Sequence, residues 1–419
     1  MIRRAFFVSA LWAFSGLALA QDKPVTPPAL PPGSDVVTNE QKQTVLDGIN
    51  KLMEERAFVP GVDFKKWPEF LAKKKEDIDK AEKPDAFIRT VNTILRDFGV
   101  SHVRLLTPRQ AVRRTQTSMT GIGVGVMPQP EGLRVSSVRE GSPAEAAGLK
   151  TGDVIVLVNG TLPTSEAALG GDEGTKHKLK FKRESEEKEV EVPVATISLV
   201  RKETLTWPKE DVAVLKIFSF GPKNYDRTNV ENLVREASAK AKTVVVDLRG
   251  NGGGAVNHLN HLLSQFLPGN SDYGTFVSRR LADDYAKAHE NKPGTTEEIA
   301  QWTKTHTKTR IGDGPLATKN FIVLINRGSG SASEICAAAL SEIKGAKLVG
   351  SNSAGAVLAS IFAPLPEGYS LQLPISDYIT IKGRRLEKNP LVPDVEVKEP
   401  VTKEKDPVLE KALELAAGG

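Results

Sequence analysis

The second half of the chain alternates continuous apolar runs with amphipathic segments, and this pattern restricts the fold more than any other feature. Residues 203–400 contain the apolar runs VAVLKIFSF, TVVVDLRG, NFIVLINRG and AKLVGS, and the first three are each followed by a segment with helical spacing. Strands that are apolar throughout are typical of sheets covered on both faces, where helices connect parallel neighbours. This half therefore predicts an α/β core with a parallel-type sheet.

Two regions of different character precede this core. Residues 37–116 contain two segments with helical spacing, TNEQKQTVLDGINKLMEERA behind a cap at Thr38 or Asn39 and DAFIRTVNTILRDFG ending at Gly99, followed by a short strand-like run, VSHVRLL. Residues 117–200 contain short runs of β-branched residues separated by Gly and Pro, which predict a small β-rich domain.

The first residues predict export. Arg3 and Arg4 precede an almost wholly apolar run at 5–18, and the tripeptide ALA ending at residue 20 provides a small-residue cleavage signal. The run is shorter than the roughly 20 residues that a spanning helix needs, so a cleaved signal peptide is favoured over an uncleaved anchor. We expect a mature chain that begins at Gln21, has no integral membrane span and resides in the periplasm or outside the cell.

The sequence thus predicts an α/β multidomain protein. Its β-rich part includes one short helix, SPAEAAGL, capped by Ser142 and ended by Gly148. A Pro-rich stretch before the first long helix predicts an extended spacer. The predicted segments are, in order, a signal peptide (1–20), the spacer (21–36), the helical region (37–116), the β-rich domain (117–200), the α/β core (201–400) and a C-terminal helix or tail (401–419).

Composition excludes several classes of function. The single cysteine, Cys336, allows no internal disulfide and falls on a predicted buried helix face, where it would be a small core hydrophobe. The six histidines and the cysteine lack metal-ligand spacing, so we expect no metal and no cofactor. The formal net charge is +5, but basic and acidic residues are interspersed and form no basic stripe with aromatics. We therefore do not expect nucleic acid as a partner.

Ser331 stands at the junction between a buried strand and a helix. The strand FIVLIN is followed by the glycine-rich turn RGSG and then by Ser331, at the start of a helical segment. Such a turn exposes the hydroxyl beside the unpaired N–H groups of the helix N-terminus, which suits a nucleophile whose product is an oxyanion. Ser331 to Glu334 also fit a capping box, so a purely structural N-cap is the competing interpretation.

Three glycines, Gly252 to Gly254, follow another buried strand in the run DLRGNGGG. A backbone without Cβ atoms can approach another group closely, and its N–H groups would complete an oxyanion hole. A plain βα loop is the alternative. A phosphate loop is disfavoured because the Lys-Ser/Thr ending of that motif is absent.

Two further side chains become candidates only in combination. His102 lies in the run GVSH, and Glu387 lies in GRRLE shortly before a Pro-Asp pair. Alone, a histidine is more often structural than catalytic, and Glu387 would be an ordinary surface carboxylate. His258 and His261 lie three residues apart on a predicted helix and are interpreted as structural or surface residues.

From about residue 37 to residue 400, the chain resembles the carboxyl-terminal processing (tail-specific) and tricorn-type serine peptidases. The resemblance rests on TGIGVGV with VREGSPAEAAGLKTGDVIVLVNG, on VVVDLRGNGGG, and on NRGSGSASEICAAAL with KLVGSNSAG, in this order. It implies that residues 117–200 are an embedded PDZ domain and that the core has a ClpP/crotonase-like peptidase fold. It also implies protein or peptide substrates that are recognised by their C-termini.

The resemblance assigns roles to particular residues. The family's nucleophile falls on Ser331, and the oxyanion donors would be the backbone N–H of Ala332 and that of one glycine among Gly252, Gly253 and Gly254. The carboxylate-binding loop of the PDZ domain falls on Gly121, Ile122, Gly123 and Val124, where a substrate C-terminus would add as a strand.

One departure from the family pattern concerns the base. Processing peptidases of the Ser-Lys type carry a lysine 25 residues after the serine and a glutamine four residues later, but here these positions are Ala356 and Ser360. The Ser-Lys dyad is therefore absent. The chain resembles the tricorn-type branch in its Ser101-His102 pair and in Glu387, which implies that His102 is the general base and acid and that Ser101 and Glu387 orient or polarise the catalytic groups.

Three functions are compatible with these residues. The first is an active exported serine endopeptidase that uses Ser331, His102 and Glu387. The second is an inactive PDZ-containing pseudopeptidase that binds protein C-termini, which is suggested by Ala356. The third is a small-ligand-binding protein on the same fold, for which the sequence offers no dedicated apolar pocket. Retention of the serine, the glycine loop, the histidine and the glutamate together favours the first.

Overall fold

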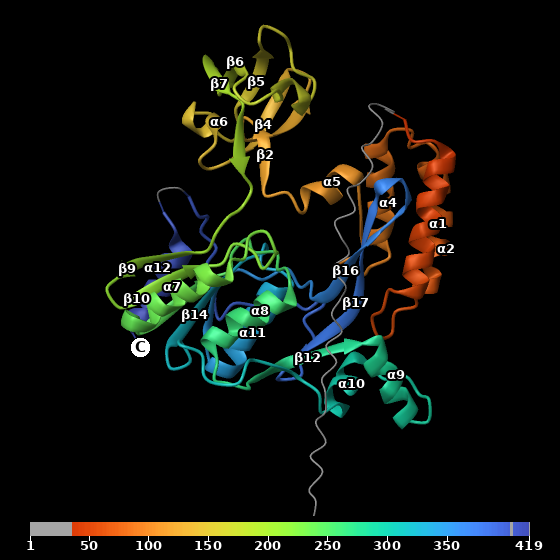
Figure 1. Cartoon of the computed structure of the whole chain (residues 1–419), viewed down its shortest axis with the longest axis vertical. Helices are drawn as coiled ribbons and strands as arrows, with labels where there is room; N and C mark the ends of the chain where they lie inside the picture. The colour runs from red at the N-terminus through yellow and green to blue at the C-terminus, as the bar shows by residue number, and fades with distance from the viewer. Residues whose placement is uncertain (1–35, 403–404, 419) are drawn as a thin grey trace, which may run out of the picture. The chain divides into compact units, whose positions relative to one another are not determined.

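The structure, a computed structural model, describes residues 36–402 and 405–418. The predicted signal peptide and nearly all of the predicted spacer lie outside the described residues. Within the described ranges, no helix is long and apolar enough to cross a membrane. The described residues all fall within one compact unit, in which the predicted helical region, β-rich domain and α/β core are all present (Figure 1).

The core contains a six-stranded sheet with the order β18-β15-β14-β11-β10-β9. The five strands from β18 to β10 are parallel, and β9 pairs antiparallel with β10 at the edge. This arrangement confirms the predicted α/β core. The strand bounds are β9 Thr204–Lys209, β10 Val212–Lys216, β11 Thr243–Asp247, β14 Asn320–Ile325, β15 Lys347–Gly350 and β18 Val395–Glu396.

Helices cover both faces of this sheet, which explains why its strands are apolar throughout. On β11, Val244 and Val246 join the core cluster that contains residues of α7 (Arg227–Lys240), α8 (Val256–Phe266) and α11 (Ala332–Lys344). Val245 points to the opposite face and packs with α12 (Pro407–Ala417). Cys336 of α11 is fully buried in the first cluster, as predicted.

A second sheet joins the helical region to the core. Its longest strand, β17 (Ser370–Thr380), pairs with β16 (Leu358–Pro364), β12 (Asp272–Ser278) and the three-residue β1 (Arg104–Leu106), and β12 pairs with β13 (Thr307–Lys308). The predicted strand-like run VSHVRLL is therefore a strand only in its last part. His102 instead lies in the turn before it, with a φ of 58°.

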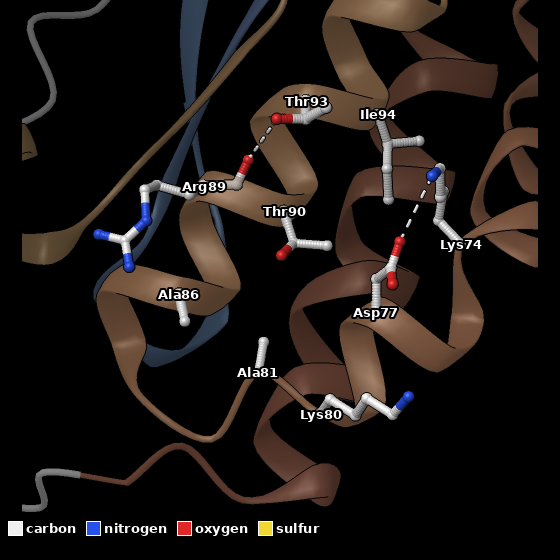
Figure 2. A pocket seen from close by; sticks show the side chains of 9 residues that line it. All are labelled: Lys74, Asp77, Lys80, Ala81, Ala86, Arg89, Thr90, Thr93 and Ile94. Atoms are coloured by element: carbon white, nitrogen blue, oxygen red, sulfur yellow. Dashed lines mark hydrogen bonds and ion pairs between the residues drawn. The ribbon is translucent and has the colours of Figure 1, made fainter.

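The helices of the N-terminal region pack against the β16–β17 hairpin. Ile49 of α1 (Asn39–Glu55) and Phe87 of α4 (Pro84–Asp97) share a core cluster with Leu371 of β17. The shorter helices of this region are η1 (Phe64–Lys66), α2 (Trp67–Lys73), α3 (Lys75–Asp79) and α5 (Pro108–Arg113), and α9 (Arg279–Ala288) and α10 (Thr296–Trp302) follow β12. A pocket lies along α3 and α4 (Figure 2).

The β-rich domain has its own sheet and its own core. Five antiparallel strands run in the order β3-β4-β5-β6-β7, so β3 lies at an edge, and β2 pairs with β8 in a separate ribbon. The predicted short helix is present as α6 with Ser142 as its N-cap. The remaining bounds are β2 Ser118–Gly121, β3 Val124–Gln129, β4 Gly132–Val138, α6 Pro143–Ala146, β5 Val154–Val158, η2 Glu166–Leu169, β6 Lys176–Arg183, β7 Glu186–Pro193 and β8 Ala195–Ser198.

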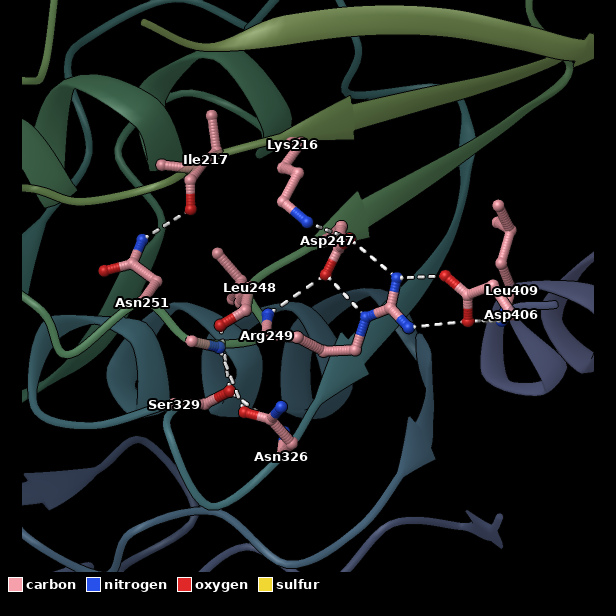
Figure 3. Close-up of polar contacts among 11 residues, drawn as sticks. Lys216, Ile217, Asp247, Leu248, Arg249, Asn251, Asn326, Ser329, Asp406 and Leu409 are labelled. Carbon is pink, nitrogen blue, oxygen red and sulfur yellow. Dashed lines mark hydrogen bonds and ion pairs between the residues drawn. The ribbon is translucent and has the colours of Figure 1, made fainter. Parts of the chain in front are cut away.

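An arginine connects the end of β11 to the last helix. The Arg249 guanidinium donates to Asp247 at 2.8 and 2.9 Å and to Asp406 at 2.7 and 2.8 Å (Figure 3). Asp406 is also the N-cap of α12. Burial alone would raise the pKa of Asp247, but the Arg249 guanidinium and the Lys216 ammonium hold it below its usual range. The ion-pair network thus fixes the start of the loop that leads to Gly252.

Replacing Arg249 with Met tests this network. We expect Arg249→Met to lower the free energy of unfolding by about 3 kcal/mol, because it leaves the buried Asp247 carboxylate without its main partner. Urea denaturation followed by circular dichroism measures the change. The matched control is Arg235→Met, since Arg235 is exposed on α7 and bonds only Asn232. Equal losses in both variants would contradict the assigned role.

Candidate active site

Ser331 is held in a strained backbone conformation between β14 and α11. Its φ is 53° and its ψ is −120°, a region that residues with a Cβ rarely adopt. Its N–H donates to the Ala356 carbonyl at 3.0 Å and to Glu334 Oε2 at 3.2 Å. Only the Glu334 half of the predicted capping box is thus formed, because the Glu334 side chain accepts from Ser331 N–H while no hydrogen bond engages the Ser331 hydroxyl within the described residues.

The glycine loop lies directly against this serine. A Cβ added to Gly253 would lie 2.7 Å from the Ser331 Cβ and 2.9 Å from the Ala332 nitrogen, so only glycine permits the approach. The fully buried Asn251 fixes the loop, because its side chain donates to the Ile217 carbonyl at 2.8 Å (Figure 3) and accepts from Gly253 N–H at 2.9 Å. Two predicted parts of the site are thus brought together.

The candidate oxyanion donors are not equivalent. Gly253 N–H is already bound to the Asn251 side chain, so its proton is committed within the loop. The N–H groups of Gly252 and Gly254 have no partner in the described part of the chain. Ala332 is the first residue of α11, where the N–H groups of a helix lack intrahelical acceptors. The donors that remain available are therefore Ala332 with Gly252 or Gly254.

A second loop is anchored to α11 through the Glu334 carboxylate, which is fully buried. Oε1 accepts from the Ser353 hydroxyl at 2.5 Å and from Gly355 N–H at 2.8 Å, and Oε2 accepts from Ala356 N–H at 3.0 Å. Burial raises the pKa of Glu334, although these donors oppose the shift. The sequence indicated Glu334 only as a capping residue, because its partners lie about twenty positions away.

Glu387, Ser101 and His102 form a relay beside that loop. The Ser101 hydroxyl donates to Glu387 Oε2 at 2.8 Å, and its oxygen lies 2.8 Å from His102 Nδ1. Because the hydroxyl proton is used toward the carboxylate, the Ser101 oxygen must accept from an Nδ1–H of His102. This tautomer leaves the lone pair on Nε2, the nitrogen that a general base uses.

His102 is neutral around physiological pH. Burial lowers its pKa to about 4 from the ordinary value of 6.5. Glu387 is 2% exposed, and its carboxylate also accepts from Ser101 N–H at 3.3 Å and from Val357 N–H at 3.0 Å. The imidazole is thus uncharged and oriented by a buried acceptor chain.

The serine and the relay meet at one short segment. Ala356 bonds Ser331 and Glu334 through its backbone, and the next residue, Val357, bonds Glu387. A cavity of about 910 Å³ is lined by Ala356, His102 and Glu387, among others. No hydrogen bond joins the Ser331 hydroxyl to His102 within the described residues.

The other predicted candidates lie apart from this cavity. His258 Nδ1–H donates to the Phe220 carbonyl at 2.9 Å, and the ring stacks on Tyr225. His261 bonds Tyr225 and Glu231, so both histidines make the structural contacts that the sequence predicted. The predicted PDZ loop borders a separate cavity of about 150 Å³. The loop contributes Gly121, Ile122, Gly123 and Val124 to the lining of this cavity, and α5 contributes Arg109 and Arg113.

Two family models match the chain. Residues 211–397 match Peptidase family S41, and residues 120–194 match the PDZ domain. The first match contains Ser331, the glycine loop and Glu387. Ser101 and His102 lie before both matches.

Curated relatives cover most of the chain at low identity. The chain is 24% identical over 339 residues to carboxy-terminal processing protease CtpB of Bacillus subtilis (strain 168), covering 78% of this chain and 65% of the relative. It is 26% identical over 353 residues to the carboxyl-terminal-processing protease of Synechocystis sp. (strain ATCC 27184 / PCC 6803 / Kazusa), covering 78% and 76%. The chain thus spans slightly less than two thirds of the length of the Bacillus relative.

Solved structures share the fold. A solved structure from Bacteroides fragilis NCTC 9343, described as that of an S41 protease, aligns with a TM-score of 0.53 at 18% identity, covering 88% of this chain and 97% of that one. The tricorn protease aligns with a TM-score of 0.51 at 15% identity, covering 90% of this chain and 37% of that one. The chain therefore carries a peptidase family S41 region at residues 211–397 and a PDZ domain at residues 120–194, and over most of its length it is similar to carboxy-terminal processing proteases.

Proposed function

We propose that this protein is an exported serine endopeptidase in which Ser331 is the nucleophile and His102 the general base. The observation that carries the proposal is the relay from Glu387 through Ser101 to His102, because it leaves an Nε2 lone pair in a cavity shared with Ala356. The strained backbone of Ser331, next to helix N–H groups, gives further support. Export rests on the sequence of residues 1–20 alone.

In the proposed reaction, His102 Nε2 takes the hydroxyl proton as Ser331 Oγ attacks the scissile carbonyl carbon. The carbonyl oxygen becomes an oxyanion that Ala332 N–H and a glycine N–H would stabilise. The imidazolium then gives its proton to the leaving amine, which leaves an acyl-serine. Water repeats the sequence, releasing the new carboxylate and restoring the hydroxyl. Ser101 and Glu387 hold the tautomer and offset the imidazolium charge.

The absence of a lysine at Ala356 is compatible with this mechanism. Ala356 acts through its backbone N–H and carbonyl, which bond Glu334 and Ser331. A base supplied by His102 would replace the missing ammonium group. The competing function is a pseudopeptidase that binds C-termini without cleaving them. A Ser331 hydroxyl that never comes within hydrogen-bond distance of His102 would favour that function.

The PDZ domain would recognise substrate C-termini. Ile122 and Gly123 lie between β2 and β3, and their N–H groups have no partner within the described residues, so a carboxylate can accept from both. β3 is an edge strand and can pair with an incoming peptide. We therefore expect proteins or peptides with free C-termini as substrates.

Active-site labelling tests the nucleophile and its base. We expect a fluorophosphonate probe to label residues 21–419 of the wild type, and we expect Ser331→Ala to abolish labelling. His102→Ala should slow labelling about 100-fold or more, because the base contributes on that scale. In-gel fluorescence against time measures the rates. His261→Ala is the control, since that side chain bonds Tyr225 and Glu231 instead. An unlabelled wild type, even with C-terminal peptides present, would favour the pseudopeptidase.

The pH dependence of labelling reports the state of His102. Because burial lowers the pKa of His102 to about 4, the imidazole stays neutral between pH 8 and pH 5. The labelling rate constant should therefore remain nearly level across that range and fall as pH approaches 4, instead of falling near 6.5. Circular dichroism at each pH checks that the fold persists. A midpoint near 6.5 would show that the base is a solvated imidazole.

Peptide binding tests the PDZ assignment. The Ser331→Ala variant should bind a fluorescent peptide with an apolar, free C-terminus about tenfold more tightly than the same peptide as an amide, because charge-assisted hydrogen bonds to backbone N–H groups are lost in the amide. Fluorescence anisotropy gives both affinities. Equal affinities would argue against C-terminus capture by the loop at Gly121–Val124.

A further inference from the structure

The cavity beside His102 is rich in positive charge. Its lining includes the cationic side chains of Arg89, Arg96, Arg104 and Lys388. The one acidic residue among its lining residues is Glu387, which is 2% exposed and whose carboxylate is bound to Ser101 and Val357. The accessible wall of the cavity is therefore cationic.

These cations are not neutralised by neighbouring carboxylates. The side chains of Arg89, Arg104 and Lys388 make no hydrogen bond or ion pair within residues 36–402 and 405–418, and Arg96 bonds only the Thr93 hydroxyl, at 3.0 Å. The sheet of the PDZ domain provides a contrast. There Lys176 on β6 pairs with a glutamate on β7 at 2.7 Å, and two further pairs follow along the same strands.

The cations come from three separate elements around the relay. Arg89 and Arg96 lie seven residues apart on α4, which places them on one face of the helix two turns apart. Arg104 begins β1, two residues after His102. Lys388 follows Glu387 directly, and its Nζ lies 3.9 Å from where a Cβ of Gly99 would be.

A neighbouring cavity along α4 marks where the unpaired positive charge ends. A second cavity of about 410 Å³ shares Arg89 and Thr93 with the first (Figure 2). Its other cations are already paired, Lys74 with Asp77 at 3.4 Å and Lys80 with Glu76 at 2.5 Å. Arg89 is thus the cation at the junction of the two cavities that has no acidic partner among the described residues.

We propose that this cationic cavity selects substrates with an acidic segment next to the scissile bond, with Asp or Glu side chains held by Arg89, Arg96, Arg104 and Lys388. The proposal rests on the proposed peptidase function and adds a substrate class to it. Four cations without acidic partners around a peptidase relay match a polypeptide that carries several carboxylates. The lining residues include no Phe, Tyr or Trp on which nucleic-acid bases would stack, so an acidic peptide is the favoured polyanion.

The expected contribution is moderate and sensitive to salt. A single exposed ion pair changes affinity by roughly 1.4- to 5-fold, and several pairs acting together reach about tenfold or more. All four cations are exposed, so salt at about 1 M, where the Debye length is about 3 Å, should remove most of the effect.

The test uses Ser331→Ala in residues 21–419 and three fluorescent peptides of equal length. They share the same apolar residues and differ in four positions that are all Glu, all Gln or all Lys, and each ends in an amide so that the PDZ loop is not engaged. Anisotropy at low salt should show the Glu peptide binding about tenfold more tightly than the Gln peptide and the Lys peptide binding most weakly. The preference should disappear at 1 M salt.

Charge reversal locates the binding surface. Adding Arg89→Glu, Arg96→Glu and Arg104→Glu should remove the preference for the Glu peptide. The matched control, with the same change in net charge, is Lys51→Glu with Arg235→Glu and Lys287→Glu, which are exposed positions outside the cavity lining and should keep it. Thermal unfolding checks both folds. If the triple variant does not fold, Arg96→Gln alone should still reduce the preference about twofold.

Each outcome supports or overturns the proposal. Equal binding of the Glu and Gln peptides, or equal losses in the cavity and control variants, would overturn it. Tighter binding of a single-stranded oligonucleotide than of the Glu peptide, lost in the cavity variant, would instead assign the surface to nucleic acid. Fluorophosphonate labelling of the wild type distinguishes a failure of this inference from a failure of the proposed peptidase function. Labelling without an acidic preference rejects this inference alone, and an acidic preference without labelling rejects the peptidase function while retaining the binding surface.

Discussion

The buried Glu334 carboxylate organises the site, because it fixes the loop at residues 353–357 to the helix that begins at Ser331. It accepts from Ser353, Gly355, Ala356 and Ser331, so a charge with no solvent contact has four donors. Without them, burial of a carboxylate would cost several kcal/mol. The same loop then reaches Glu387 through Val357 N–H. Ser331, the proposed nucleophile, and the relay are therefore positioned by neighbouring residues of one backbone segment.

The sequence predicted those features that depend on local or periodic patterns. The strand at β11 was predicted because both of its faces are apolar, and the helix cap at Ser331 because its signals lie within four residues. The pairing of β1 with β17 was not predicted, since nothing local specifies a register between Arg104 and Gln372. Contacts across such separations depend on tertiary packing, which single-sequence patterns do not encode.

The relay illustrates the same limit at the level of chemistry. Ser101 and Glu387 are 286 positions apart, and only the resemblance to tricorn-type peptidases joined them beforehand. Neither residue carries a local signal of its role. The Nδ1–H tautomer of His102 required the direction of the Ser101 hydrogen bond, which is a property of the assembled structure. The hydrogen bond from Gly253 N–H to Asn251 was not predicted either, because three adjacent glycines are indistinguishable in sequence.

The charge of the cavity and the chemistry of the base are linked. In the proposed mechanism, His102 is neutral at rest because of burial and becomes an imidazolium when Ser331 loses its proton, inside a cavity that four cationic side chains also line. The negative charge of Glu387 offsets this positive charge, but it acts through the Ser101 hydroxyl instead of contacting the imidazole. An acidic substrate segment would neutralise the cations at the moment when the imidazolium forms. Substrate binding would then stabilise the transition state as well as the bound complex, so charge complementarity would raise the rate of the chemical step in addition to affinity.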